Sequence, residues 1–269
     1  MSSATLTELD ARYHFACDVA KTAASRALSW YQQRHQLVVE HKKHLQDVVS
    51  EADRNVEALV KHLIHERFPE DAVRGEESGG EIAGARFIWV IDPIDGTSSF
   101  VNGLHNWCVA LAIVCEDEPV IGVVCDPNHH ETFHACRGKG AWVNDTRIQA
   151  HSAQALNQGV LGVSSSNSQP AEAFITLISG LLAQGGMFIR NGSGALMSAW
   201  AAAGRLIGYY EAHMHPWDGL PGIVLMREAG GCTNDYLIHA GLQNGNPVLL
   251  ANAVLYPQLK ALLPDHPSL

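Results

Sequence analysis

The chain has 269 residues, of which 46% are hydrophobic and 17% are charged, and its formal net charge at pH 7 is -10. This balance is typical of a globular protein with a sizeable core and argues against a disordered chain. The acidic net charge argues against a nucleic-acid-binding surface, which needs a basic patch, so we expect no nucleic-acid partner.

The N-terminal residues and the cysteines indicate a cytoplasmic protein. Charged residues interrupt the first twenty positions, which therefore do not resemble a signal peptide. The longest apolar run, Trp107 to Cys115, is too short to span a bilayer, so we expect no membrane association. The six cysteines form no CxxC pair, and we expect free thiols in a reducing compartment.

Two helices are predicted near the N-terminus. Apolar residues recur at steps of three and four from Leu9 to Tyr31, the spacing of an amphipathic helix. A second helix is predicted to begin at Ser50, with Asp53 three residues later as in a capping box, and to end before Pro69.

Four apolar runs that follow predict β-strands. They are Phe87 to Ile91, Cys108 to Cys115, Val120 to Cys125 and Thr132 to Cys136. Their connections are too short for crossover helices, so we expect an antiparallel meander that ends at the GKGAWVN stretch, residues 138–144.

Strands and helices alternate after residue 150. The predicted strands are Val160 to Val163, Met187 to Arg190, Leu206 to Glu211 and Val248 to Ala251, and the predicted helices are Glu172 to Leu182, Ala195 to Ala203, Gly219 to Ala229 and a short last one. We therefore expect two halves packed as one body. Residues 1–150 hold the first helices, the antiparallel sheet and most of the acidic motifs, and residues 151–269 form an α/β half.

Four acidic clusters lie where loops or the ends of elements are expected. They are Asp47 with Asp53, the GEES of residues 75–78, the DPIDGT of residues 92–97, and the HPWD that ends in Asp218. Each alone has an ordinary interpretation: a turn, a solvated face, a structural Ca²⁺ loop or, for Asp218, a helix N-cap. Together they offer oxygen ligands only, which suits Mg²⁺ better than zinc.

The DPIDGT motif brings two carboxylates close together. Pro93 favours an extended Asp92, and a turn after Asp95 would let both carboxylates and the Ile94 carbonyl face one point. Such a pair repels unless a cation or a proton lies between the two groups. The residues after Asp95 could begin a helix whose free N–H groups hold a phosphate, so the motif indicates phosphoryl chemistry.

The motifs DVVSEAD, GEES, WVIDPIDGTSSF, RGKGAWVN and YYEAHMHPWDGLPG with REAGG run in this order from about Arg12 to Leu262. In this the chain resembles the inositol monophosphatase family, within the superfamily of Mg²⁺-dependent, lithium-sensitive phosphatases. The resemblance implies an α+β fold, the layered αβαβα sandwich of the inositol monophosphatase and fructose-1,6-bisphosphatase type, and a homodimer.

The resemblance also implies the residues of a two-metal site that holds two or three Mg²⁺ ions. The metal ligands would be Glu76, Asp92, the Ile94 carbonyl, Asp95 and Asp218. The catalytic residues would be Asp53 and Thr97, which together deprotonate the attacking water, and Glu77, which acts through water around a further metal.

The substrate implied by the resemblance is a small polyol or sugar phosphate such as myo-inositol 1-phosphate. The substrate-binding residues would be Ile94, Asp95, Gly96, Thr97, Gly192, Ser193, Gly194, Glu211 and Asp218. The alternatives are a histidinol-phosphate phosphatase, a fructose-1,6-bisphosphatase, a nucleotide 3′-phosphatase, a structural Ca²⁺ protein, or a non-catalytic regulatory binding protein on this fold. Glu211 disfavours a second phosphate beside it.

Two features depart from the family pattern. Gly219-Leu220-Pro221-Gly222 follows the last aspartate, and we expect Pro221 in the first turn of a helix, where proline is tolerated. His213 and His215 precede that aspartate; without further histidine ligands we expect them to pack or to face the substrate rather than to bind zinc. Both departures concern the identity of the substrate, not the reaction.

Overall fold

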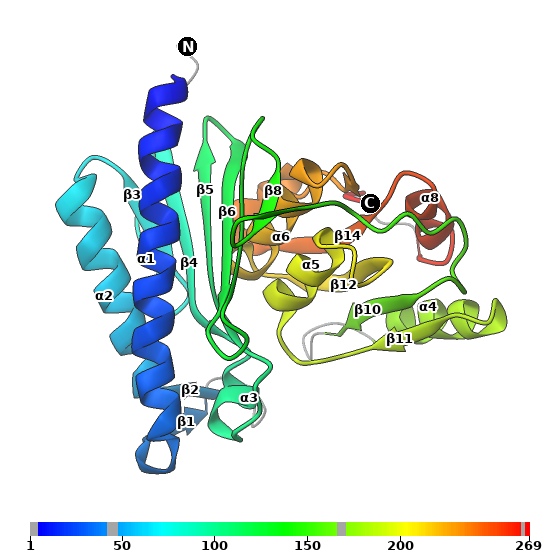
Figure 1. Ribbon diagram of the computed structural model, residues 1–269, viewed down its shortest axis with the longest axis horizontal. Helices are drawn as coiled ribbons and strands as arrows, with labels where there is room; N and C mark the ends of the chain where they lie inside the picture. The colour runs from blue at the N-terminus through cyan, green and yellow to red at the C-terminus, as the bar shows by residue number, and fades with distance from the viewer. Residues whose placement is uncertain (1–4, 42–47, 166–170, 265–266) are drawn as a thin grey trace.

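The computed structural model describes residues 5–41, 48–165, 171–264 and 267–269, and its elements form five layers (Figure 1). In order, the layers are α1 (Leu6–Gln32) with α2 (Glu51–Arg67), a seven-stranded sheet, α5 (Gly194–Ala202) with α6 (Pro216–Glu228), a five-stranded sheet, and α4 (Glu172–Ala183) with α8 (Leu255–Lys260). This arrangement confirms the predicted αβαβα sandwich. No helix within the described residues is long and apolar enough to cross a membrane.

The two N-terminal helices confirm the sequence prediction. The residues that α1 buries fall at the predicted steps between Leu9 and Tyr31. Helix α2 has Ser50 as its N-cap, and Asp53 completes the capping box in both directions. Because α2 ends before Pro69, the proline costs it no hydrogen bond.

The seven-stranded sheet has the order β3-β4-β5-β6-β7-β8-β9. Its strands are β3 (Ala72–Gly75), β4 (Phe87–Asp95), β5 (Cys108–Cys115), β6 (Glu118–Asp126), β7 (Glu131–Cys136), β8 (Ala141–Val143) and β9 (Thr146–Ile148). The four predicted strands are present, and each is antiparallel to the next of the four. The predicted end of the meander is wrong, because β8 lies within residues 138–144 and β9 follows. Strand β3, parallel to β4, was not predicted either; strands of three or four residues are too short to show a period of two.

Helices cover both faces of the central strands β4 and β5, which are buried along their whole length. Trp89 and Ile91 pack toward α1 and α2, whereas Val90, between them, packs with residues of α5 and α6. This double cover explains why these strands read as continuous apolar runs.

The five-stranded sheet has the order β11-β10-β12-β14-β13. Its strands are β10 (Val160–Ser164), β11 (Met187–Ile189), β12 (Gly208–Met214), β13 (Cys232–Thr233) and β14 (Asn246–Ala251). Strand β12 extends beyond its predicted end at Glu211, and its pairing with β14 shifts register between Glu211 and Met214. Strands of the first sheet lie before residue 150 and those of the second after it, while the division into two halves stays a prediction.

Helix α6 begins at Pro216, three residues earlier than predicted, with His215 as its N-cap. Proline is favourable at the first helical position, which explains the earlier start. Asp218 therefore lies inside the first turn and is not the N-cap. Pro221 lies inside the helix, so its expected place in the first turn is wrong.

The remaining elements are short. They are β1 (Val39–His41), β2 (Val48–Ser50), α3 (Thr97–Val101), α7 (Gly241–Asn244) and the 3-10 turns Arg34–Gln36 and Ile238–Ala240. All six cysteines are free, as expected.

Candidate active site

Three carboxylates from two layers meet at the end of β4. Asp92 and Asp95 come from β4 and Asp218 from the first turn of α6, and one oxygen of each lies within 4.8 Å of the other two. Asp92 pairs with Ala110 on β5 and Asp95 with Cys108, so three steps on β4 match two on β5. This bulge turns both aspartates to the same face of the sheet, toward α6.

The acid cluster is electrostatically unfavourable without a cation. Burial raises the pKa of Asp92 and of Asp218 well above the usual range, and the charges of neighbouring carboxylates, Glu76 among them, raise both further. Burial likewise raises the pKa of Asp95. Carboxylate oxygens are the ligands that Mg²⁺ prefers, and a divalent cation would remove the repulsion, so the residues present fit the metal that the resemblance implies.

Asp95 is held by the first residues of α5. Its Oδ2 accepts hydrogen bonds from Ser193 Oγ at 2.5 Å and from the Ala195 backbone N–H at 2.8 Å, which leaves Oδ1 for the acid cluster. Gly96 makes this approach possible, because a Cβ atom there would lie 3.2 Å from Ser193 Cβ and 2.7 Å from the Asn106 carbonyl oxygen. The bonds fix one side of the acid cluster.

Asp53 and Thr97 form the predicted pair beside the acid cluster. Thr97 Oγ1 lies 3.1 Å from Asp53 Oδ1 and 3.0 Å from the Ile94 carbonyl oxygen, and its single proton can be donated to either. The other oxygen of Asp53 accepts hydrogen bonds from the Ser50 backbone N–H and hydroxyl at 2.8 and 2.7 Å. Burial raises the pKa of Asp53, so its proton affinity exceeds that of an exposed aspartate. Asp47, from the same motif, lies outside the described residues.

The GEES motif forms the loop after β3, and a residue that the sequence analysis missed holds it. Glu57, on α2, accepts hydrogen bonds from the Glu77 backbone N–H at 2.8 Å and from the Ser78 backbone N–H at 3.0 Å. The Glu76 backbone N–H donates to the Ile91 carbonyl oxygen at 3.1 Å, which places Glu76 beside the end of β4 that carries Asp92. The available signal was a charged residue one helical turn after Asp53, on the same face of α2.

Four of the predicted substrate residues lie on β12 and at or just before the start of α5: Glu211, Gly192, Ser193 and Gly194. Glu211 accepts the Tyr209 hydroxyl proton at 2.6 Å, and burial raises the pKa of Glu211 to about 7. A Cβ atom on Gly194 would lie 2.7 Å from Met214 Cε and 3.2 Å from Glu211 Oε2, so the glycine allows these side chains to pack against the start of α5. Gly192 adopts a φ of 92°, which favours glycine, and Ser193 is the N-cap of α5.

His213 and His215 lie near each other, with ring centroids 5.1 Å apart, and the His215 ring stacks on Trp217 at 4.8 Å. Among the described residues, the one group of three or more potential metal ligands is Asp92, Asp95 and Asp218. Neither histidine belongs to it. The stacked ring favours the packing role for His215 over a zinc site.

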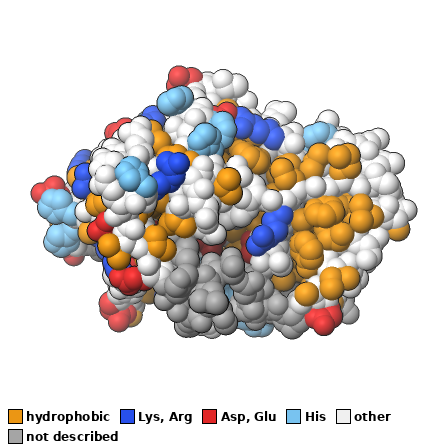
Figure 2. Space-filling view, turned by 90° about the horizontal axis from the view of Figure 1, so that it is seen from below, with side chains coloured by type: hydrophobic (Ala, Val, Ile, Leu, Met, Phe, Trp, Pro, Cys, Tyr) orange, Lys and Arg blue, Asp and Glu red, His pale blue; other side chains and the backbone are white. Residues whose placement is uncertain are grey.

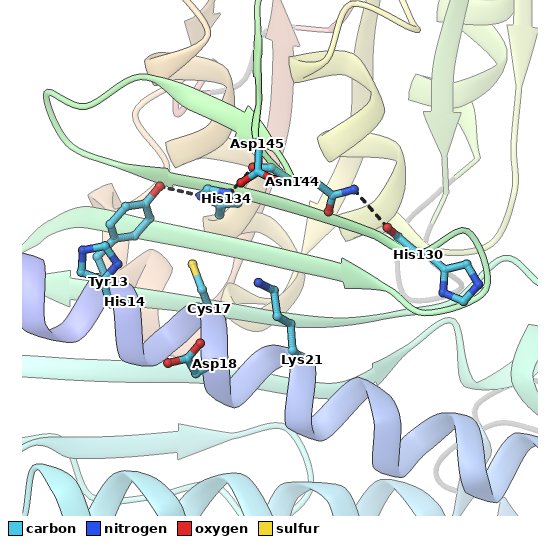
Figure 3. Close-up of a pocket in the computed structure, with 9 residues that line it drawn as sticks. All are labelled: Tyr13, His14, Cys17, Asp18, Lys21, His130, His134, Asn144 and Asp145. Carbon is cyan, nitrogen blue, oxygen red and sulfur yellow. Dashed lines mark hydrogen bonds between the residues drawn. The ribbon is translucent and has the colours of Figure 1, made fainter.

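A separate pocket of about 570 Å³ lies between α1 and β7 (Figure 3). Across it the Tyr13 hydroxyl lies 2.5 Å from His134 Nδ1, and His134 Nε2 lies 2.9 Å from the Asn144 carbonyl oxygen. None of the predicted site residues lines this pocket. The acid cluster is therefore the candidate active site.

Known proteins resemble this chain over most of its length. The model of the inositol monophosphatase family matches residues 8–266. The Nus factor SuhB of Escherichia coli K12 is 35% identical over 220 residues, which cover 77% of this chain and 82% of that protein. The inositol-1-monophosphatase of Synechocystis is 33% identical over 240 residues, 86% of this chain and 81% of that protein. The solved structure of the extragenic suppressor protein suhB from Bartonella henselae covers 94% of this chain and 98% of its own at 27% identity, with a TM-score of 0.86.

Proposed function

The chain belongs to the inositol monophosphatase family, and from that premise we propose that it is a Mg²⁺-dependent phosphomonoesterase acting on a small polyol or sugar phosphate such as myo-inositol 1-phosphate. The hydrogen bond between Thr97 and Asp53 carries the proposal. It lies at the Ile94 carbonyl, between the two aspartates of β4, where a proton acceptor could reach water at the acid cluster.

Two or three Mg²⁺ ions would be held by Glu76, Asp92, the Ile94 carbonyl, Asp95 and Asp218. When bound, they would neutralise the phosphoryl charge and lower the pKa of the attacking water. Lithium would inhibit the enzyme by competing at this site.

The chain's own residues perform the proton transfer and hold the substrate. Asp53 takes the water proton through the Thr97 hydroxyl, for which its raised pKa is suitable. The water oxygen bonds to phosphorus as the ester P–O bond breaks. The leaving alkoxide takes up a proton from solvent, and Asp53 later returns its proton to solvent, so the protons balance. Glu77 orients a further water, and the backbone N–H groups of Gly96 and Thr97 bind the phosphate.

The substrate side supports a polyhydroxylated leaving group. An ionised Glu211 accepts hydrogen bonds only, which suits vicinal hydroxyls, and it repels a second phosphate. Gly192, Ser193 and Gly194 would line the space beside it, while Ile94, Asp95 and Asp218 border the substrate from the metal side. The amine of histidinol phosphate would also suit Glu211, so that substrate remains the alternative within the superfamily.

We further propose a cytoplasmic homodimer, consistent with the six free thiols. The surface over β11 and α4 is largely apolar (Figure 2), and Met187, Phe188 and Ile189 on the edge strand β11 are exposed. A second copy would bury this surface. Light scattering should report a dimer, and Phe188→Asp should yield a monomer if the surface is the interface.

The function is tested by phosphate release from a panel of esters. The panel contains myo-inositol 1-phosphate, glucose and galactose 1-phosphates, fructose 1,6-bisphosphate, histidinol phosphate and adenosine 3′,5′-bisphosphate. We expect release that requires Mg²⁺, stops with EDTA and is lost in Asp95→Asn. Absence of release by folded, Mg²⁺-binding protein would overturn the proposal.

A regulatory binding role is the second candidate, because relatives of 35% identity carry the name Nus factor SuhB. In that case the protein would bind a macromolecular partner and would turn over none of the esters, and the expectation of no nucleic-acid partner would need its own binding measurement. The Asp53–Thr97 pair favours the enzyme.

A further inference from the structure

We propose that Glu57 is a positioning residue that holds the loop of Glu76 and Glu77 in place and thereby sets the Mg²⁺ affinity of the acid cluster. This inference rests on the proposed function. It concerns a residue on α2 that lies outside the predicted ligand set and acts through the loop backbone.

The Glu57 carboxylate is bonded entirely to the loop and to its own helix. Oε2 accepts the Glu77 backbone N–H at 2.8 Å, and Oε1 accepts the Ser78 backbone N–H at 3.0 Å as well as the Ser78 hydroxyl. Lys61 Nζ lies 3.1 Å from Oε1 and also donates to the Gly79 carbonyl oxygen at 2.7 Å. One side chain thus binds two consecutive N–H groups next to Glu76.

The Glu57 carboxylate is buried and closely packed against the backbone of Gly75. Glu57 is 2% exposed, and a Cβ atom on Gly75 would lie 2.3 Å from Glu57 Cδ. A buried carboxylate is costly unless its oxygens are hydrogen-bonded, and here the donors come from the loop. Displacing the loop would leave Glu57 buried without these partners, so the loop is held where it is.

Helix α2 joins this loop to the proton acceptor. Asp53 and Glu57 are four residues apart, on one face of a continuous helix. Asp53 is hydrogen-bonded to Thr97, and Glu57 is hydrogen-bonded to the loop. Helix α2 therefore sets the distance between the proton acceptor and the loop that carries Glu76.

The loop needs such a restraint because Glu76 carries the same charge as the aspartates of the acid cluster. The Glu76 backbone N–H donates to the Ile91 carbonyl oxygen at 3.1 Å, one residue before Asp92, so like charges gather at this end of β4 before a cation binds. Without Glu57 the loop could relax away from the acid cluster, and Mg²⁺ binding would have to bring it back. Residues that orient metal ligands affect metal affinity for this reason.

The test is a Mg²⁺ titration of the melting temperature, compared between Glu57→Gln and Glu66→Gln. Ligand binding to the folded state raises the melting temperature in proportion to the logarithm of 1 + [Mg²⁺]/Kd, so a fit of melting temperature against Mg²⁺ concentration gives the Kd without turnover. Gln at residue 57 keeps the shape but puts an NH₂ group against the loop N–H groups. Glu66 is the matched control, since it lies on the same helix with its side chain 63% exposed.

We expect Glu57→Gln to raise the fitted Kd for Mg²⁺ by about 10- to 100-fold, and Glu66→Gln to leave it unchanged. A lower melting temperature in EDTA with an unchanged Kd would show a structural role only and would overturn the inference. Should Glu57→Gln not fold, Ser78→Ala decides in the same way, because it removes one of the same hydrogen bonds. A wild-type melting temperature that does not change with Mg²⁺ would refute the proposed function itself, which is a different outcome.

Discussion

The two sides of the acid cluster are built by different means. On the side of β4 and α2, Asp53, Glu57 and Asp95 are buried, and hydrogen bonds of 2.5–3.1 Å hold each of them. On the side of α5 and β12, Gly194 allows Met214 and Glu211 to pack closely, and Glu211 is the single carboxylate. The first side fixes the groups that react, and we expect the second side to bind the substrate.

This difference separates the reaction from its selectivity. Groups that transfer protons or bind a metal must be held to fractions of an ångström, which requires hydrogen bonds from several elements. Groups that accept a substrate need shape and one or two polar contacts. Substitutions on the first side should therefore lower kcat, and those on the second side should change KM or stability.

The largest effect is expected for Asp53→Asn. The amide keeps the size of the side chain but cannot accept the proton passed by Thr97, so kcat should fall by roughly 10²- to 10⁴-fold. The measurement is phosphate release at saturating Mg²⁺ and substrate. The Mg²⁺-dependent rise in melting temperature should persist, and a kcat within threefold of wild type would remove Asp53 from the mechanism.

Sequence patterns predicted the long elements of the fold because buried apolar residues recur along them at the spacing of a helix or form a continuous strand. The steps from Leu9 to Tyr31 and the capping box at Ser50 gave both N-terminal helices. Strands of three or four residues, such as β3 and β8, carry too few positions to show a period. The start of α6 was missed because the predicted helix began only after Asp218, at Gly219, although proline is favourable at the first helical position.

The candidate site was predicted in its charged residues but not in the contacts that hold them. Asp92 and Asp95 were expected to converge, whereas the bulge against β5 that brings them to one face depends on a partner strand. Glu57 looked like an ordinary solvated helix residue because its partners are backbone N–H groups of another element. Because every residue except proline has a backbone N–H group, the sequence does not indicate which of these groups a carboxylate will bind.

A smaller loss, in stability, is expected for Gly122→Ala at the contact between β6 and α6. A Cβ atom there would lie 2.5 Å from the Pro221 carbonyl oxygen and 3.1 Å from Pro221 Cα. Because both atoms are backbone, α6 must shift, at a cost of roughly 1–3 kcal/mol in the free energy of unfolding. Urea unfolding measures it. Since α6 carries Asp218, Mg²⁺ affinity should fall too; unchanged stability and affinity would mean that α6 is free to move.

The half-buried Glu211 should make stability depend on pH. Burial is the main reason that its pKa rises from 4.5 to about 7; Arg190, Ser164 and the Tyr209 hydroxyl act against burial, and Asp95 adds to it. The folded state therefore binds this proton more tightly than the unfolded state, and its contribution to stability is lost as pH rises from about 4.5 to about 7.

Glu211→Gln removes that dependence. In EDTA the variant should be more stable than wild type by roughly 1–2 kcal/mol at pH 8, with the difference shrinking toward pH 5. Thermal or urea unfolding at both pH values measures it. A difference that is the same at pH 5 and pH 8 would show that Glu211 titrates like an exposed carboxylate. With a polyol phosphate the same variant should raise KM more than it lowers kcat.

The smallest effect is expected for Glu228→Gln, far from either side of the acid cluster. Glu228 belongs to the REAGG motif, and its two oxygens accept the backbone N–H groups of Gly138 and Gly140 at 2.9 and 2.8 Å. The amide can accept only one of these bonds, so unfolding should become easier by about 1 kcal/mol. Because the bonds join α6 to the turn before β8 and contact no acid of the site, kcat and KM should stay at wild-type values. A change in either constant would show that a shift of α6 at Glu228 reaches Asp218 at the other end of the helix. The acid cluster would then depend on contacts beyond its own hydrogen bonds.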